Sequence, residues 1–497
     1  MKNKPVFVWV ILSFAYFATR LINLKILPIF TDEAIYSFWA QVALHDPANR
    51  FISLEDGKQP LFIWIAATFQ KFISDPLIAT RLVSVFAGFG SLIGIYLVSN
   101  LLFNNKKIAW TACFLYIIFP FTLLYDRMGI FDSLLTMIGI WAVFFSVKMA
   151  KDPKLDLAML NGITIGLGLI TKSSAEFYLY LLPFSLIFFN FSKKDRSNRF
   201  YHWLGWSAIT FLIAEVIYNS LRLSQFFYII GRKNMEFIRS VSEVIKNPLE
   251  FSVSNFHALT QWVYTYMGAV FFFVFLAGLI YGLYKRKHQI IYLAVLIFAP
   301  FSAEVIFNKV LYARFALFYF PYVIIILSFT IVTLFELFSK YKKVIIAIVI
   351  LGLIVPLSTS FFLLTNPPKA NIADNDKNQY INDWPAGYGV SEIINILKQE
   401  SSKGDVYVGT EGTFGLYPYS LQVYFYSNPN VHIYGYWPVD ANSLPKQIID
   451  FSKDYKTYFI YNFTQASIAD KHTHLVAKYQ KGSGNSYMRL FQVEYDR

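Results

Sequence analysis

The sequence predicts a polytopic α-helical membrane protein that carries a C-terminal α/β domain outside the membrane. The chain is 56% hydrophobic and only 15% charged, whereas soluble domains usually carry about a quarter charged residues. Long apolar runs outnumber alternating ones over the first 365 residues, and in lipid only helices or closed barrels satisfy their backbone hydrogen bonds. Residues 366–497 are more polar and contain short alternating runs, as in a soluble domain.

The apolar runs set the number of predicted spans. A helix crosses the hydrocarbon core with roughly 20 apolar residues, and about eleven segments meet that length within a few residues. They are approximately 5–27, 78–102, 108–125, 133–150, 155–171, 174–192, 201–221, 259–284, 289–307, 312–337 and 344–364. The first is interpreted as an uncleaved helix, because no small-residue cleavage site follows it. The run 59–73 is shorter and is predicted to lie in the interface.

Basic residues predict the orientation. If the N-terminus is cytoplasmic and 59–73 does not cross, the main basic clusters all face the cytoplasm, as the positive-inside rule requires. These clusters are Lys106-Lys107, Lys148/Lys151/Lys154, Lys193-Lys194/Arg196/Arg199, Lys285-Arg286-Lys287 and Lys340/Lys342-Lys343. We therefore expect a multi-pass protein of the cell (plasma) membrane with an extracytoplasmic C-terminal domain. The rule also explains much of the net charge of +13, so nucleic-acid binding is not expected.

The tail divides from the membrane part near Asn366-Pro367-Pro368, which gives two predicted domains, 1–365 and 366–497. Alternating apolar residues predict strands at 405–409, 431–434 and 457–461. Helical periodicity predicts amphipathic helices at 391–399 and 444–451. The predicted tail is therefore a small α/β domain.

Two adjacent acids, Asp32 and Glu33, follow the first span and lie at the predicted outer boundary of the membrane. One interpretation is structural: Thr31 caps an interfacial helix, and acids in its first turn complement the helix dipole. The other is catalytic, since a positioned, ionised carboxylate can take a proton from an acceptor hydroxyl. The two interpretations are compatible, because a helix start also fixes a carboxylate rigidly.

Several cations are predicted on the same outer side. Lys58 lies in a turn fixed by Gly57 and Pro60, where it either anchors a helix at the headgroups or contacts a phosphate. The residues that share this side are Lys58, Arg127, Lys172 and Arg314. Together they suit a diphosphate or a phosphate ester, although interfacial cations are common anchors. In the hairpin between two spans, Asp126, Arg127 and Asp132 could instead form an ionic cluster that pins the turn.

Other chemistries have little support. No P-loop, dinucleotide-binding, His-Glu-x-x-His or Ser/His/Asp pattern occurs at a suitable position. Cys113 is the single cysteine, so an intramolecular disulfide and a cysteine-based metal site are excluded. No cofactor is expected from the sequence, and a divalent metal ion is left open.

Five motifs in order resemble one family. They are Asp32-Glu33-Ala34-Ile35-Tyr36, then Lys58-Gln59-Pro60-Leu61-Phe62-Ile63-Trp64, Ala79-Thr80-Arg81-Leu82, the Arg127–Asp132 hairpin, and the glycine-rich span from Gly162 to Lys172. This order resembles the GT-C glycosyltransferases, in the branch of protein O-mannosyltransferases and aminoarabinose lipid A transferases. Gln59 departs from the family pattern, which has proline there. The resemblance covers residues 1–200 well and 201–365 loosely.

The resemblance implies an enzyme that moves a sugar from a polyprenyl-phosphate carrier to an acceptor hydroxyl on the outer face, with inversion. Asp32 would be its base, assisted by Glu33, and Lys58 would contact the donor phosphate. The remaining expected substrate-binding residues are Arg81, Arg127, Asp132, Lys172 and Arg314. The expected partners are that donor, membrane lipids and a protein, lipid or glycan acceptor. Metal is not required in this branch.

Three other functions fit parts of the pattern. An oligosaccharyltransferase or glycan ligase of related architecture would transfer a whole glycan and would usually need metal. A transporter or flippase for a lipid-linked substrate would need interrupted helices and charges near the midplane, whereas most charges here lie at span ends. A non-catalytic envelope protein would tolerate loss of Asp32 and Lys58.

Overall fold

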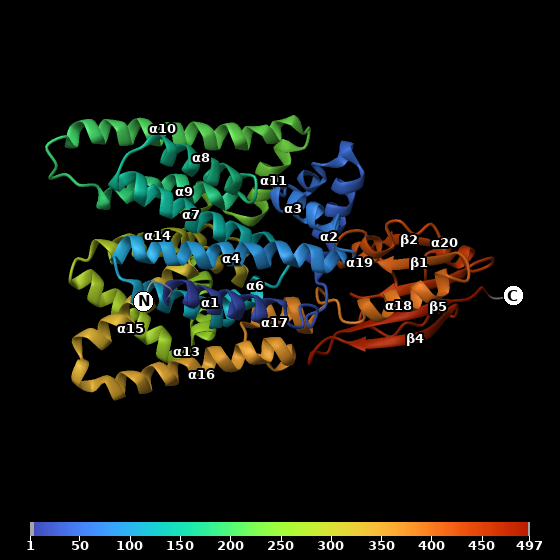
Figure 1. Cartoon of the computed structure of the whole chain (residues 1–497). Helices are drawn as coiled ribbons and strands as arrows, with labels where there is room; N and C mark the ends of the chain where they lie inside the picture. Colours follow the sequence, from blue (N-terminus) through green and yellow to red (C-terminus); the bar gives the residue numbers. More distant parts are fainter. Residues whose placement is uncertain (1–3, 496–497) are drawn as a thin grey trace.

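A computed structural model describes residues 4–495 as a bundle of roughly aligned helices with a small α/β domain at one end (Figure 1). Within those residues, seven helical segments are long and apolar enough to cross a membrane. The long helices are α4 (Pro76–Phe103), α7 (Phe131–Lys151), α10 (Arg196–Asn219), α13 (Ser252–Tyr284), α14 (His288–Phe307), α15 (Phe320–Leu337) and α16 (Lys342–Thr365). The predicted membrane class is thus confirmed.

The other predicted spans are shorter or broken. They correspond to α1 (Lys4–Leu21), α5 (Lys106–Ile118), α6 (Pro120–Tyr125), α8 (Leu155–Leu169) and α9 (Glu176–Leu181). The run 108–125 divides where Pro120 begins α6, because proline cannot donate the hydrogen bond that would continue α5. The run 174–192 divides at a 3₁₀ helix, Leu182–Phe188, that has a proline in its first turn. Sequence hydropathy did not distinguish these breaks from continuous spans.

The end of the bundle nearest the α/β domain carries short helices (Figure 1). These are α2 (Thr31–His45), α3 (Leu61–Gln70), α11 (Phe227–Phe237) and α12 (Val241–Lys246). Helix α3 has 10 residues and is therefore about 15 Å long, half of the hydrocarbon thickness. The apolar run at 59–73 accordingly forms a helix too short to span.

The C-terminal domain is a five-stranded sheet with helices. Its strands are β1 (Val406–Glu411), β2 (Val431–Tyr436), β3 (Lys456–Tyr461), β4 (Thr473–Gln480) and β5 (Tyr487–Val493), in the order β2-β1-β3-β5-β4. Strands β2, β1 and β3 are parallel, while β5 and β4 add antiparallel pairs. Its helices are α18 (Val390–Ser401), α19 (Leu416–Phe425) and α20 (Lys446–Phe451). Helix α17 (Asp374–Lys377) comes earlier in the chain and lies against the bundle (Figure 1). The predicted α/β tail is confirmed, whereas α19, β4 and β5 were missed.

The two parts meet at α2. Helix α19 packs against α2, with the ring of Phe38 stacked on Tyr419 at 4.8 Å between centroids. The amide of Thr31 donates to the carbonyl of Pro385 at 3.1 Å, and Phe30 forms a β-bridge with Ala386. The segment that follows α16 therefore holds the start of the helix that carries Asp32.

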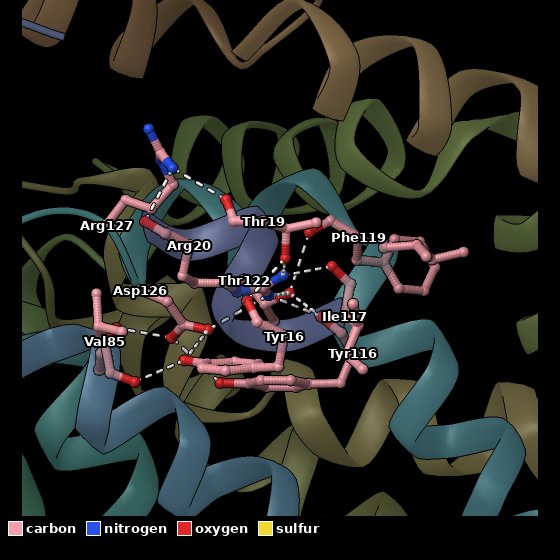
Figure 2. A network of polar contacts seen from close by, with 12 residues as sticks. Tyr16, Thr19, Arg20, Val85, Tyr116, Ile117, Phe119, Thr122, Asp126 and Arg127 are labelled. Carbon is pink, nitrogen blue, oxygen red and sulfur yellow. Dashed lines mark hydrogen bonds and ion pairs between the residues drawn. The ribbon is translucent and has the colours of Figure 1, made fainter. Parts of the chain in front are cut away.

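A buried polar network fixes the end of α1 (Figure 2). The Arg20 guanidinium pairs with Asp126 at 3.4 Å, and both side chains are fully buried. Hydroxyls of Tyr16, Tyr116 and Ser133 donate to the same carboxylate at 3.2–3.3 Å. Because each group has partners, the network can remain buried without an uncompensated charge. It joins α1 to the hairpin between α6 and α7.

Arg127 adds a second restraint at the same place. Its guanidinium donates to the carbonyls of Thr19, Arg20, Ile22 and Asn23 at 2.7–2.9 Å. These carbonyls lie at the end of α1, where helical backbone groups lose their internal partners. The predicted Asp126–Arg127–Asp132 cluster is therefore not formed, since Asp126 pairs with Arg20 and Asp132 pairs with Lys172.

Candidate active site

Asp32 lies in the first turn of α2. The helix starts after Phe30, whose extended backbone (φ −113°, ψ 174°) turns the chain into the helix. Thr31 is not the capping residue, because it is already helical and its hydroxyl donates to the Pro385 carbonyl at 3.3 Å. The position of Asp32 and Glu33 at the positive end of the helix dipole favours carboxylates there.

Glu33 faces the interior. It accepts two hydrogen bonds from Arg81, at 2.7 Å each, and one from the Gly129 amide at 2.6 Å. Both charged side chains have no exposed surface. Arg81 also donates to the carbonyls of Leu24, Leu27 and Pro28. This buried pair positions α2, the preceding segment and the hairpin, and neither member reaches a solvent-accessible surface.

Asp32 faces the opposite way and is partly open. Its side chain is 24% exposed, and its Oδ2 atom pairs with Arg314 at 2.7 Å. Arg314 lies in a 3₁₀ helix, Ala313–Phe318. The Asn375 side chain accepts a hydrogen bond from the Ala313 amide at 3.2 Å, which fixes the start of this helix. No described residue forms a hydrogen bond or ion pair with the Oδ1 atom of Asp32.

A second ion pair lies beside the first. Lys172 contacts Asp132 at 2.8 Å, and its ammonium lies 4.5 Å from the ring centroid of Phe315, the residue after Arg314. The Lys172 side chain is 30% exposed, compared with 7% for Asp132. The cation therefore retains access to the solvent-facing side, while the carboxylate anchors it.

Lys58 completes the group. No described residue forms an ion pair with its ammonium, which lies 5.1 Å from the ring centroid of Phe237. Burial lowers the pKa of Lys58, the carboxylates of Asp32 and Asp56 oppose that shift, and the cations of Arg314 and Lys172 add to it. These electrostatic neighbours place Lys58 in the same cluster as Asp32.

The structure thus brings five sequence-predicted residues together: Asp32, Lys58, Asp132, Lys172 and Arg314. It places three others elsewhere. Glu33 and Arg81 form the interior pair, and Arg127 caps α1 through backbone carbonyls. Their position at span ends resembled that of the cluster residues, but their side chains point into the protein.

Two tyrosines also lie near the cluster: Tyr36, which the sequence analysis named only as the aromatic residue of the first motif, and Tyr380, which it missed. Tyr36 lies one helical turn after Asp32, and Tyr380 follows α17. The ring of Tyr380 packs edge-on against Phe30 at 4.8 Å between centroids. Its buried hydroxyl has no partner among the described residues. Burial raises the pKa of Tyr380, and the nearby carboxylates of Asp376 and Asp32 raise it further against the opposing effect of Arg314, so the phenol remains a proton donor.

Asp376 stabilises this region through buried hydrogen bonds. It accepts hydrogen bonds from Tyr125, at 2.7 Å, and from Tyr266. Burial raises its pKa to about 6. No signal in the sequence singled out Asp376 or Tyr380, because both lie beyond the last span in a segment without a recognisable motif.

Within residues 4–495, no group of three or more His, Cys, Asp or Glu side chains could hold a metal ion.

Comparison with known proteins identifies the fold. Residues 57–218 match the family described as dolichyl-phosphate-mannose-protein mannosyltransferase. ArnT from Cupriavidus metallidurans in the apo state is similar over 99% of this chain and 98% of its own, with a TM-score of 0.58 and 10% identity. The chain has the GT-C fold. No curated protein matches the sequence significantly.

Two further structures share the GT-C fold. ArnT from Cupriavidus metallidurans bound to undecaprenyl phosphate has a TM-score of 0.54 and 12% identity, over 99% of this chain and 98% of its own. The oligosaccharyltransferase AglB from Archaeoglobus fulgidus, in complex with an inhibitory peptide and a dolichol-phosphate, has a TM-score of 0.53 and 13% identity. That match covers 93% of this chain and 70% of AglB.

The family match covers only part of the cluster described above. It includes Lys58, Asp132 and Lys172, and it begins after Asp32. Arg314 and Tyr380 also lie outside it. The cluster therefore combines residues inside the family match with residues outside it. The latter are assigned to the cluster by the structure alone.

Proposed function

We propose that this protein is an inverting membrane glycosyltransferase that moves a sugar from a polyprenyl-phosphate carrier to an acceptor hydroxyl. The observation that carries the proposal is the Asp32 carboxylate, which is partly exposed, pairs with Arg314 through one oxygen and lies near Lys58, which in turn lies near Lys172. A base and several positive charges in one cluster match the two needs of this reaction.

In the proposed reaction, the acceptor hydroxyl gives its proton to the Oδ1 atom of Asp32. Its oxygen bonds to the anomeric carbon as the bond from that carbon to the phosphate oxygen breaks on the opposite face, so the configuration inverts. The departing polyprenyl phosphate gains one negative charge. Preorganised cations stabilise such charge in the transition state, and Lys58, whose ammonium forms no ion pair with a described residue, is the proposed direct contact.

The donor class is supported by what the similar structures contain. One ArnT structure holds undecaprenyl phosphate and the AglB structure holds a dolichol-phosphate. Both ligands are polyprenyl phosphates. A site with lysine and arginine side chains at the end of a helical bundle suits the phosphate of such a carrier, while its chain would lie in the lipid.

The proposed orientation places the site outside the cytoplasm. The connections from α13 to α14 and from α15 to α16 lie at the end of the bundle opposite the α/β domain (Figure 1). Both connections carry basic clusters, Lys285–Lys287 and Lys340–Lys343. The positive-inside rule assigns that end to the cytoplasm, which supports a cytoplasmic N-terminus and an outward-facing cluster around Asp32.

The test is genetic complementation with a chemical readout. Deleting the gene should remove one glycan from the cell envelope, as detected by mass spectrometry, and the wild-type gene should restore it. Asp32→Asn should fail to restore it while the protein accumulates normally, because the amide is nearly isosteric but cannot accept the proton. Asp152→Asn, a change at a solvent-exposed ion pair, is the control and should restore the glycan. Restoration by Asp32→Asn would contradict the proposal.

A further inference from the structure

The parallel half of the C-terminal sheet has an edge at which ligands commonly bind. Strand β1 lies between β2 and β3. The connection that follows β1 leads to β2 on one side of β1, and the connection that follows β2 crosses to β3 on the other side of β1. The two neighbours of β1 are therefore reached in opposite directions, which makes the carboxyl end of β1 a switch point. In open α/β sheets, ligands bind in the crevice at such a switch point.

Large aromatic side chains are exposed at this edge. Phe414 follows β1, Trp437 follows β2 and Phe463 follows β3, with 51%, 57% and 52% of their surfaces exposed. Trp384, from the segment before α18, is 38% exposed. Phe463 lies between the two tryptophans, with ring centroids 5.5 Å from Trp437 and 5.9 Å from Trp384. We call these four residues the aromatic edge; such a concentration of exposed rings usually marks a binding surface.

The aromatic edge adjoins the cluster around Asp32. Trp384 precedes Pro385, whose carbonyl accepts the hydrogen bond from the Thr31 amide, one residue before Asp32. On the other side, Phe414 lies 6.3 Å from Trp39 between ring centroids, and Trp39 lies 5.9 Å from Tyr36. Residues 32, 36 and 39 share one face of α2, because helical neighbours recur every three or four positions. Tyr36 and Trp39 are buried, so these ring contacts pack the edge of the sheet against the helix that carries Asp32.

The loops that form the aromatic edge are held in place by buried charges. The Glu411 carboxylate, at the end of β1, accepts hydrogen bonds from the amides of residues 462, 463 and 464 at 2.7–3.0 Å. Lys481, which is fully buried, donates to the Trp384 carbonyl at 2.8 Å. Rigid rings bind ligands with a smaller loss of conformational entropy than mobile ones.

The charge of these loops indicates which ligand they suit. Residues 382–385, 412–415, 437–440 and 462–467 contain Asp383 and Asp440, and they contain no Lys or Arg. Contact with an anionic membrane surface requires basic residues. Exposed rings interspersed with Asp, Asn, Thr and Gln side chains instead suit a neutral ligand with both C–H faces and hydroxyl groups, which is the chemistry of a sugar ring.

We propose that the aromatic edge is a carbohydrate-binding subsite that holds a glycan acceptor beside Asp32. Its role as the acceptor subsite rests on the proposed glycosyltransferase function, whereas glycan binding can be measured without turnover. The sugar rings stack on Trp437, Phe463 and Trp384, and the acceptor hydroxyl extends along α2 toward Asp32.

The test uses the purified full-length protein in detergent micelles on an array of immobilised neutral oligosaccharides. Wild type should bind at least one of them, and Trp437→Ala and Phe463→Ala should weaken that binding by about tenfold or more, because each removes a stacking ring. Trp437→Phe keeps a ring and should retain most of the affinity. Tyr495→Ala is the matched control, since Tyr495 is 43% exposed and lies at the opposite edge of the same sheet, and it should bind as wild type does.

The two proposals fail in different ways. The complementation test with Asp32→Asn does not depend on the oligosaccharide array, so restoration of the glycan by Asp32→Asn would contradict the glycosyltransferase proposal and leave the binding result intact. Wild type that binds no oligosaccharide, or Trp437→Ala and Phe463→Ala variants that bind as tightly as wild type, would overturn the carbohydrate subsite. Quenching of Trp437 fluorescence by brominated lipids in nanodiscs, measured against Trp437→Phe, would place the ring in the bilayer and would also overturn it.

Discussion

Glu33 and Arg81 form a bidentate ion pair from which solvent is excluded on both sides, with two N–O distances of 2.7 Å. The adjacent acid, Asp32, instead pairs with Arg314 at a partly exposed position. Neighbouring carboxylates on one helical turn therefore have different surroundings: Glu33 fixes the start of α2, and Asp32 lies at a partly exposed position.

Arg81→Met should destabilise the protein rather than weaken substrate binding. The substitution leaves Glu33 buried without its cation, which typically costs about 3–5 kcal/mol in the free energy of unfolding. Thermal unfolding in detergent should show a clear decrease in Tm, while Lys154→Met, at an exposed ion pair, should leave Tm unchanged. A normal Tm together with a raised KM for the donor would instead assign Arg81 to substrate binding.

Tyr380→Phe should reduce turnover without reducing stability. It removes only a hydroxyl that is buried and has no partner among the described residues, so Tm should stay the same or rise. If that hydroxyl donates to a charged substrate oxygen, kcat should fall by about ten- to a hundredfold. Tyr322→Phe, in the buried face of α15, is the control. Equal kcat values for Tyr380→Phe and wild type would remove Tyr380 from the reaction.

The charge of Lys58 should set an alkaline limit on activity. Burial lowers the pKa of Lys58, and a phosphate contact requires the protonated form. As the pH rises through that pKa, kcat/KM should therefore fall, at a pH below the ordinary lysine value of about 10.4. Lys58→Arg should lose this alkaline decline because arginine stays protonated, although its maximum should be lower. Lys71→Arg, at an exposed position, should keep the wild-type profile, and an unchanged profile in Lys58→Arg would exclude this role.

Lys481 should make the stability of the C-terminal domain depend on pH. Burial lowers its pKa to about 7 in the folded protein, compared with about 10.4 when unfolded. Between these values the unfolded chain binds the extra proton, so stability should rise with increasing pH, by up to about 1.4 kcal/mol per pH unit. Lys481→Met should flatten this dependence in chemical unfolding measured from pH 7 to 9. An identical slope in the variant would place the effect on another group.

Much of the cluster could be predicted because its residues follow the ends of apolar runs. Counting spans assigns Asp32, Lys58, Lys172 and Arg314 to one side of the membrane, and the structure brings them together. The same counting cannot separate them from Arg81 and Arg127, which lie at similar depths but turn inward to carboxylate or carbonyl partners. The direction in which a side chain points depends on tertiary packing, and the number and order of spans give no information about that packing.

The remaining differences have equally local causes. Pro120 and the proline after Leu182 break apolar runs that hydropathy treats as continuous. Tyr380 enters the site because Asn375, Asp376 and Ala386 attach its segment to distant residues. Such long-range attachments leave no periodic pattern in the sequence, so the segment was predicted only as part of the tail.

The bridge between Phe30 and Ala386 has a consequence for biosynthesis. Its two residues are separated by more than 350 positions of sequence, so a nascent chain emerging from the ribosome inserts nearly all of its helices before the partner of Phe30 exists. Contacts of such long sequence separation form late. In a truncated or unfinished polypeptide the contacts of Glu33 with Arg81 and Gly129 would hold the start of α2, whereas the bridge of Phe30 would form only after the last quarter of the protein has been made.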